Sequence, residues 1–198
     1  MKKNDFSAAI QALKEGELII YPTDTLYALG ADIYNDTAVK KVFNLKRRPY
    51  SIPLPIAVSS IQAIDTIAWM NDTARKVSEK FLPGSVTIIL KKKPVVPSLV
   101  TSGFDTIAIR IPKNPIALKL LSEYGPLTVT SANIHEEKTQ GTIKDILQQI
   151  KTSIPVCLHD GRKEGAASTI VDLSMKKPQV VREGSISEKE LLDVISHG

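Results

Sequence analysis

The chain has 198 residues, a formal net charge of +5 and an estimated pI of 9.2. Hydrophobic residues make up 42% of it and charged residues 24%, which predicts a folded, soluble protein. No apolar run approaches the roughly 20 residues of a membrane-spanning helix, and residues 1–10 lack the apolar core of a secretory signal. The moderate positive charge favours anionic partners without naming one.

Helical and strand patterns alternate in the first half of the chain. Phe6, Ile10 and Leu13 share one helical face and Gly16 ends the segment, so residues 5–16 predict a helix. Two further helices are expected, at residues 35–46 and 72–81. Short apolar or β-branched runs predict strands at residues 17–22, 27–34, 54–58 and 85–90.

The same alternation continues in the second half. Asn114 caps a predicted helix that Gly125 ends, and Ser187 and Glu190 have the spacing of a capping box. Helices are therefore expected at residues 114–125, 143–150 and 187–195. Strands are expected at residues 106–111, 127–131, 156–160, 168–173 and 179–183. The pattern predicts a three-layer α/β fold, a single domain over residues 1–198 with helices covering a mixed sheet.

Several common catalytic motifs are absent from the sequence. It has no GxxxxGK[ST] phosphate loop, no GxGxxG dinucleotide turn and no GxSxG elbow. His135, His159 and His197 are scattered and show no metal-ligand spacing. The single cysteine, Cys157, lies in a predicted strand and is expected in the core, which agrees with a reducing cytoplasm. Metal hydrolases and serine hydrolases are therefore disfavoured.

Polar residues follow a buried strand at the start of the chain. Thr23, Asp24 and Thr25 stand between the apolar run at 17–22 and a second segment with a buried pattern. Buried hydroxyl and carboxylate groups need partners. The cluster therefore either closes a turn with itself or lines a cavity for a ligand.

Two other polar groups also lie beside predicted element ends. Lys46 and Arg48 end a helix, where they either interact with its dipole or bind a phosphate. Ser131 and Asn133 follow a strand, where they either form a capped turn or donate hydrogen bonds to a ligand.

Two arginines lie in apolar strands. Arg110 falls in the middle of one strand pattern and Arg182 ends another. A buried arginine requires an anionic partner, and no acidic residue close in sequence is an obvious partner for Arg110. A bound carboxylate or phosphate is therefore expected at Arg110.

Six motifs occur together in a fixed order: YPTDTLYALG, KRRP, PGSVTIIL, IAIRIP, TVTSAN and STIVD. In this order they resemble the YrdC-like threonylcarbamoyl-AMP synthases, and the resemblance covers about residues 16–184. The resemblance implies a twisted, mainly mixed sheet around a concave basic cavity that holds ATP without a phosphate loop.

The resemblance also implies a reaction. Members of this family combine L-threonine, bicarbonate or CO2, and ATP into threonylcarbamoyl-AMP and pyrophosphate. A downstream tRNA threonylcarbamoyl-transferase complex then modifies adenosine 37 of tRNA. The implied enzyme is a cytoplasmic nucleotidyltransferase with no membrane contact, and Mg²⁺ accompanies the ATP without dedicated protein ligands.

Site residues follow from the same resemblance. It implies four catalytic residues: Lys46, Arg48, Ser131 and Asn133. It implies that these four bind ATP together with Thr106 and Arg182, and that threonine is bound by Thr23, Thr25, Arg110 and Ser168. Both Lys46 and Arg48 are expected to be exposed to the cavity. Ile52 and Ala57 depart from the pattern, because many members carry Asn and His there.

Two other functions stay open. One is a module that binds double-stranded RNA or tRNA in the same basic cavity without turnover, through phosphate contacts. The other is a sensor that binds ATP or threonine without reaction. The lysines at 91–93 are either a basic patch or a solvated strand end.

Overall fold

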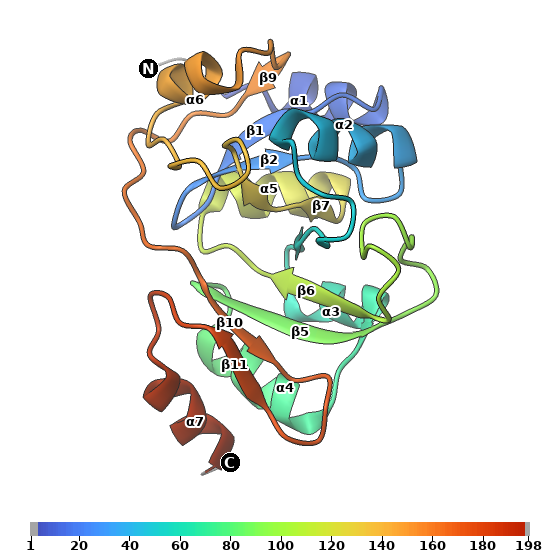
Figure 1. Cartoon of the computed structure of the whole chain (residues 1–198), viewed down its shortest axis with the longest axis vertical. Coiled ribbons are helices and arrows are strands. Elements are labelled where there is room, and N and C mark those ends of the chain that lie inside the picture. The colour runs from blue at the N-terminus through green and yellow to red at the C-terminus, as the bar shows by residue number, and fades with distance from the viewer. Residues whose placement is uncertain (1–3, 197–198) are drawn as a thin grey trace.

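The structure of the protein is a computed structural model that describes residues 4–196, so His197 lies outside the described residues. Its strands form two separate sheets (Figure 1). The first sheet has the strand order β8 (Thr130–Ser131), β2 (Tyr27–Gly30), β1 (Ile19–Pro22) and β9 (Val156–Cys157). Four helices surround it: α1 (Phe6–Lys14), α2 (Asp36–Lys46), α5 (Pro115–Tyr124) and α6 (Ile143–Ile150).

The second sheet mixes parallel and antiparallel pairs. Its strand order is β11 (Gln179–Arg182), β10 (Thr169–Asp172), β5 (Val86–Lys92), β6 (Thr106–Arg110), β3 (Ile56–Ala57) and β7 (Leu127–Thr128). The short strand β4 (Ala68–Trp69) pairs with the far end of β5. Three helices accompany this sheet: α3 (Ile61–Ile67), α4 (Asp72–Phe81) and α7 (Glu188–Ser196).

Side-chain caps fix where several helices begin. Asn35 accepts a hydrogen bond from the backbone N–H of Ala38, and Asn114 accepts from Ile116 and Ala117. The predicted helices are all present, with small shifts at their ends. The sequence interpretation missed α3, which is only seven residues long. It also missed β4, a two-residue strand that exists only through its pairing with β5.

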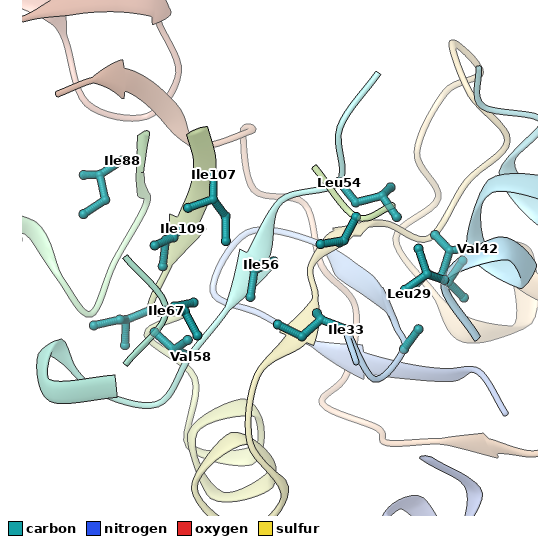
Figure 2. Close-up of a cluster of buried hydrophobic side chains, with 14 of the residues drawn as sticks. Leu29, Ile33, Val42, Leu54, Ile56, Val58, Ile67, Ile88, Ile107 and Ile109 are labelled. Atoms are coloured by element: carbon teal, nitrogen blue, oxygen red, sulfur yellow. The ribbon is translucent and has the colours of Figure 1, made fainter. Parts of the chain in front are cut away.

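One hydrophobic core connects the two sheets. Figure 2 shows one cluster that runs from Leu29 and Val42, of the first sheet and α2, through Ile56 to Ile109 of the second sheet. All four side chains are completely shielded from solvent. Truncating such a residue to alanine typically costs about 2–5 kcal/mol of stability, so the core holds the two sheets in a fixed relation.

The two faces of the second sheet have different roles. Ile88, Ile109 and Val171 are buried on the face that packs against α3 and α4 (Figure 1). Successive side chains of a strand point to opposite faces. Thr87 and Arg110 therefore lie on the opposite face, which turns toward the first sheet.

The α/β class predicted from the sequence is confirmed, with two mixed sheets in place of one. The strand predicted at 27–34 ends at Gly30 and leaves the pairing with β1 there. No helix among residues 4–196 is long and apolar enough to cross a membrane.

Candidate functional site

A cavity of about 570 Å³ lies between the two sheets. Its walls come from the turn between β1 and β2, from β8, and from the open face of β5, β6, β10 and β11. This volume is within the usual range for small-molecule sites. Its polar lining residues are Thr23, Thr25, Tyr27, Arg48, Thr87, Arg110, Thr130, Ser131, Thr139, Ser168 and Arg182.

The Thr23–Thr25 turn both pairs with itself and lines the cavity. The Thr23 hydroxyl accepts hydrogen bonds from the backbone N–H groups of Thr25 and Leu26, each at 3.1 Å, and donates to the Leu26 carbonyl at 2.7 Å. The Thr25 hydroxyl accepts from Arg110 at 2.9 Å. The cluster therefore closes a turn with itself and also lines a cavity. The turn satisfies the hydrogen bonds of the Thr23 hydroxyl and places Thr25 at the cavity wall.

Arg110 has a carboxylate partner within the protein, Asp24, which the sequence interpretation did not identify. Its Nη2 lies 2.7 Å from Oδ2 of Asp24, and both side chains are largely buried. Nε donates to the Gly84 carbonyl and Nη1 to Thr25. Three of its five N–H groups thus have partners among the described residues, and two are left for a ligand in the cavity.

Asp24 fixes the direction in which Arg110 points. Its Oδ1 accepts from the backbone N–H of Lys113 at 2.9 Å, and its Oδ2 accepts from the Ser85 hydroxyl at 2.9 Å. Burial lowers the pKa of Arg110, and the Asp24 charge opposes that shift. Asp24 therefore holds the Arg110 guanidinium in a fixed position at the cavity wall.

Arg48 and Arg182 add two more cations to the cavity wall. Arg48 donates to the carbonyls of Ile52 and Pro53 at 3.0 and 2.9 Å, and Arg182 donates to the Ser168 carbonyl at 2.8 Å. Burial lowers the pKa of both groups, and at Arg182 the charge of Arg110 lowers it further. No Asp or Glu of residues 4–196 lines the cavity, so the site favours an anionic ligand.

Lys46 is buried, and the expectation that it is exposed to the cavity is wrong. Only 2% of the residue is exposed. Its Nζ donates to the carbonyls of Ser131 and Asn133 and to Oδ1 of Asn133, at 2.6, 2.7 and 3.0 Å. An ammonium group has three N–H donors, so all of them are used. Burial and the charge of Arg48 lower the pKa of Lys46 to about 7.

The residue between Lys46 and Arg48 explains why the two side chains diverge. Arg47 caps α2 with φ of 52° and ψ of 36°, a left-handed conformation that ends the helix. Lys46 therefore still projects from the helix toward β8, whereas Arg48 lies in the following loop and reaches the cavity.

Ser131 and Asn133 form one hydrogen-bonded unit with Lys46. The Ser131 hydroxyl donates to Oδ1 of Asn133 at 2.6 Å, and Nδ2 of Asn133 donates to the Glu137 carbonyl at 2.6 Å. Ser131 lines the cavity, whereas Asn133 lies behind it and is buried. The lysine thus holds the turn that carries Ser131.

Ser168 lies beside a hydroxyl that the sequence interpretation missed. Thr87 of β5 and Ser168 just before β10 share a hydrogen bond of 2.8 Å, and both line the cavity. The segment before Ser168 approaches the Thr23–Thr25 turn so closely that a Cβ at Gly165 would lie 2.7 Å from the Thr25 carbonyl oxygen. Thr87 could have been found as the one polar residue between Val86 and Leu90, the apolar part of β5.

The predicted site residues fall into two groups. The cavity is lined by Thr23, Thr25, Arg48, Arg110, Ser131, Ser168 and Arg182. Three others lie outside its lining. Lys46 and Asn133 are buried behind Ser131, and Thr106 begins β6 on the open face of the sheet, four residues before Arg110. Asp24 was named in the polar cluster, but its ion pair with Arg110 could not be predicted from the sequence.

The side chains at the site do not fit a metal held by the protein. Among residues 4–196 there is no group of three or more His, Cys, Asp or Glu that could hold a metal ion. Mg²⁺ prefers carboxylate oxygens, and the cavity wall has none in this part of the chain. We therefore assign no residue to Mg²⁺.

Comparison with known proteins identifies the family. The Sua5/YciO/YrdC family model, described as "Telomere recombination", matches residues 11–184, which is more than half of the chain. A Methanocaldococcus jannaschii protein is 41% identical over 177 residues, covering 89% of this chain and 84% of the relative. The threonylcarbamoyl-AMP synthase of Pyrococcus abyssi is 36% identical over 188 residues, covering 92% of this chain and 55% of the relative.

A solved structure agrees with these matches. P. abyssi Sua5 complexed with L-threonine superposes with a TM-score of 0.90 at 34% sequence identity, over 96% of this chain and 57% of that chain. The chain thus spans slightly more than half of the P. abyssi proteins that it matches. The motifs, the fold and the matched range agree, and the chain belongs to the Sua5/YciO/YrdC family.

Proposed function

We propose that the chain is a threonylcarbamoyl-AMP synthase, a nucleotidyltransferase that uses ATP, L-threonine and bicarbonate or CO2. One observation carries the proposal: a single cavity brings together Arg48, Arg110 and Arg182, with no lining carboxylate among the described residues. Both substrates that must meet there, an amino acid carboxylate and a triphosphate, are anions that arginine binds well. The names and ligand of the relatives support the same activity.

The reaction has two bond-forming steps. The threonine amine attacks CO2, a C–N bond forms, and the amine loses a proton to give a carbamate. A carbamate oxygen then attacks the α-phosphorus of ATP, and the bond to pyrophosphate breaks. Transfer of this kind depends mainly on positioning and charge neutralisation.

Arg110 is the proposed contact for the threonine carboxylate. Its two remaining N–H groups match a carboxylate, and Asp24 holds the guanidinium in place. Thr25 and Ser168 supply hydroxyls beside it, and Thr23 shapes the turn. These groups orient threonine so that its amine faces the ATP.

Arg48 and Arg182 are the proposed contacts for the phosphates, with the Ser131 hydroxyl as a further donor. Lys46 and Asn133 are not proposed as direct phosphate contacts, because all three N–H donors of the lysine already have partners. They hold the Ser131 turn in position. Thr106 lies along the same sheet face, where it is proposed to contact the nucleoside portion of ATP.

The proposed reaction also needs a metal ion and a downstream partner. Mg²⁺ arrives bound to ATP, and its charge adds to that of the arginines. We place the enzyme in the cytoplasm, where its product passes to a complex that transfers the threonylcarbamoyl group to adenosine 37 of tRNA.

Product analysis tests the proposed reaction. Purified protein is incubated with ATP, L-threonine and ¹³C-bicarbonate, and the nucleotides are separated by mass. We expect a threonylcarbamoyl-adenylate that carries the ¹³C label, formed in step with pyrophosphate. AMP without a labelled adenylate would mean that the protein only hydrolyses ATP, which would contradict the proposal.

A module that binds double-stranded RNA in the same cavity is the second candidate. The cationic wall would serve it too, and its binding would weaken steeply with salt. Such a module would bind RNA with no labelled adenylate in any condition, and RNA would compete with ATP for the cavity.

A further inference from the structure

The cavity occupies only part of the open face of the second sheet. Residues paired across neighbouring strands share a face, as do residues two apart along one strand. Ala108 pairs with Ile89 inside the cavity, and Thr106 pairs with Lys91 two residues farther out. Lys91 in turn pairs with Trp69 of β4. The row Trp69–Lys91–Thr106 therefore continues the same face beyond the cavity.

Trp69 is unusually exposed for a residue of its size. Its relative exposure is 62%, and it is the only tryptophan of the chain. The Lys93 ammonium lies 4.6 Å from the centroid of the indole ring. An aromatic ring with a cation beside it on an open surface offers both stacking and charge to a ligand.

Neither Lys91 nor Lys93 has an ion pair among the described residues, and Lys93 donates one of its three N–H groups to the Asp65 carbonyl. Lys91 is also exposed. Among the nearby carboxylates, Asp65 pairs with Arg75 at 3.4 Å, Asp172 accepts two hydrogen bonds from Ser174, and Asp105 is exposed beside Thr106. Lys91 and the remaining donors of Lys93 are available to an anionic partner.

We propose that Trp69, Lys91 and Lys93 form an outer subsite for single-stranded nucleic acid, with one base stacked on Trp69 and adjoining phosphates at the two lysines. Stacking on an exposed aromatic side chain is stronger than an exposed cation–π contact, so a base can share or take the place of Lys93 at the ring. A duplex keeps its bases stacked inside and cannot offer one to Trp69, which distinguishes this subsite from duplex binding in the cavity.

The spacing places this subsite outside the reaction chamber. Thr106 and Arg110 are four residues apart on one strand, which corresponds to about 13 Å. Lys91 and Trp69 lie on the strands beyond Thr106, so a nucleic-acid strand bound there borders the proposed nucleoside contact and leaves the chamber around Arg110 open. The inference does not depend on the proposed reaction, because Trp69, Lys91 and Lys93 line no part of the cavity.

The single tryptophan makes the test direct. Its emission is recorded while a short oligouridylate is added at about 50 mM salt, with ATP and an RNA duplex added separately. We expect saturable quenching by the single strand only. Absence of quenching would overturn the proposal. Quenching by ATP at equal concentration would also overturn it and assign the subsite to a free nucleotide.

Variants give a second readout through the anisotropy of a labelled oligouridylate. Trp69→Ala is expected to lower affinity on the order of tenfold, and Trp69→Phe to retain most of it. Lys91→Ala and Lys93→Ala are each expected to reduce the salt slope by about 0.7. Lys80→Ala is the matched control, since Lys80 is exposed on α4, which covers the opposite face.

Activity separates this inference from the proposed function. Threonine-dependent pyrophosphate release by Trp69→Phe and Lys93→Ala should equal that of the wild type, because neither residue lines the cavity or pairs with Thr106. Wild-type oligouridylate affinity in Trp69→Ala would overturn the subsite and leave the synthase proposal intact. If the wild-type protein shows no turnover but its tryptophan emission is still quenched by oligouridylate, the synthase proposal fails and the subsite stands.

Discussion

Replacing Arg110 by alanine is expected to lower kcat/KM for threonine roughly 10²-fold while ATP still binds. Loss of a buried charge-assisted contact costs about 2–5 kcal/mol, and each 1.4 kcal/mol corresponds to a factor of ten. Arg110 is the cavity cation with a fixed orientation and two free donors, so the carboxylate subsite depends on it most. Steady-state kinetics with threonine varied, beside calorimetric titration of ATP, measures both effects.

The Arg110 variant needs a control for folding. Removing the arginine alone leaves Asp24 buried without its ion pair, which costs about 3–5 kcal/mol of stability. The double variant Asp24→Asn/Arg110→Gln removes both charges and should recover most of the stability. Its threonine kinetics should remain impaired. A selective loss of ATP affinity, with threonine kinetics intact, would mean that the two subsites are reversed.

Lys46→Ala is expected to abolish turnover and to destabilise the protein by about 2–5 kcal/mol. The substitution leaves three buried oxygen acceptors of Ser131 and Asn133 without their shared donor, and it creates a void beside β8. Arg48→Ala is the matched comparison. Arg48 lines the cavity and donates to two loop carbonyls, so this variant should lose turnover with a smaller drop in Tm than Lys46→Ala.

Thermal unfolding and pyrophosphate release of the two variants test this distinction. Equal Tm values for Lys46→Ala and the wild type would contradict a supporting role for the lysine. The pH dependence gives a second readout, because the pKa of Lys46 is about 7 in the folded protein and 10.5 ordinarily. Between these pH values the unfolded chain holds more protons, so the free energy of unfolding should rise with pH, by up to about 1.4 kcal/mol per unit. Lys46→Met should lack this contribution.

Sequence patterns within one segment predicted most helices and strands. They could not predict which distant strands pair with one another. Asn35 and Asn114 are visible as caps in the sequence, and both cap helices in the structure. The division into two sheets depends on contacts such as that of β1 with β9, which are more than a hundred residues apart. Periodicity along one segment carries no information on its partner strand, so the number of sheets could not be predicted.

The candidate site shows the same limit. Thr25 and Arg110 were singled out because polar groups beside buried strands need partners, and they meet in the structure at 2.9 Å. The partner of Arg110 is Asp24, 86 residues earlier, and only the folded chain brings them together. Lys46 looked like a surface cation at a helix end, but the left-handed cap at Arg47 leaves it directed inward.

Release of pyrophosphate by the purified protein, with ATP and bicarbonate present and L-threonine added or withheld, tests the central claim most directly. The proposed synthase predicts release that depends on threonine and is not reproduced by serine at equal concentration. If ATP binds and no pyrophosphate is released under any of these conditions, the cavity is a binding site without turnover and the synthase assignment is wrong.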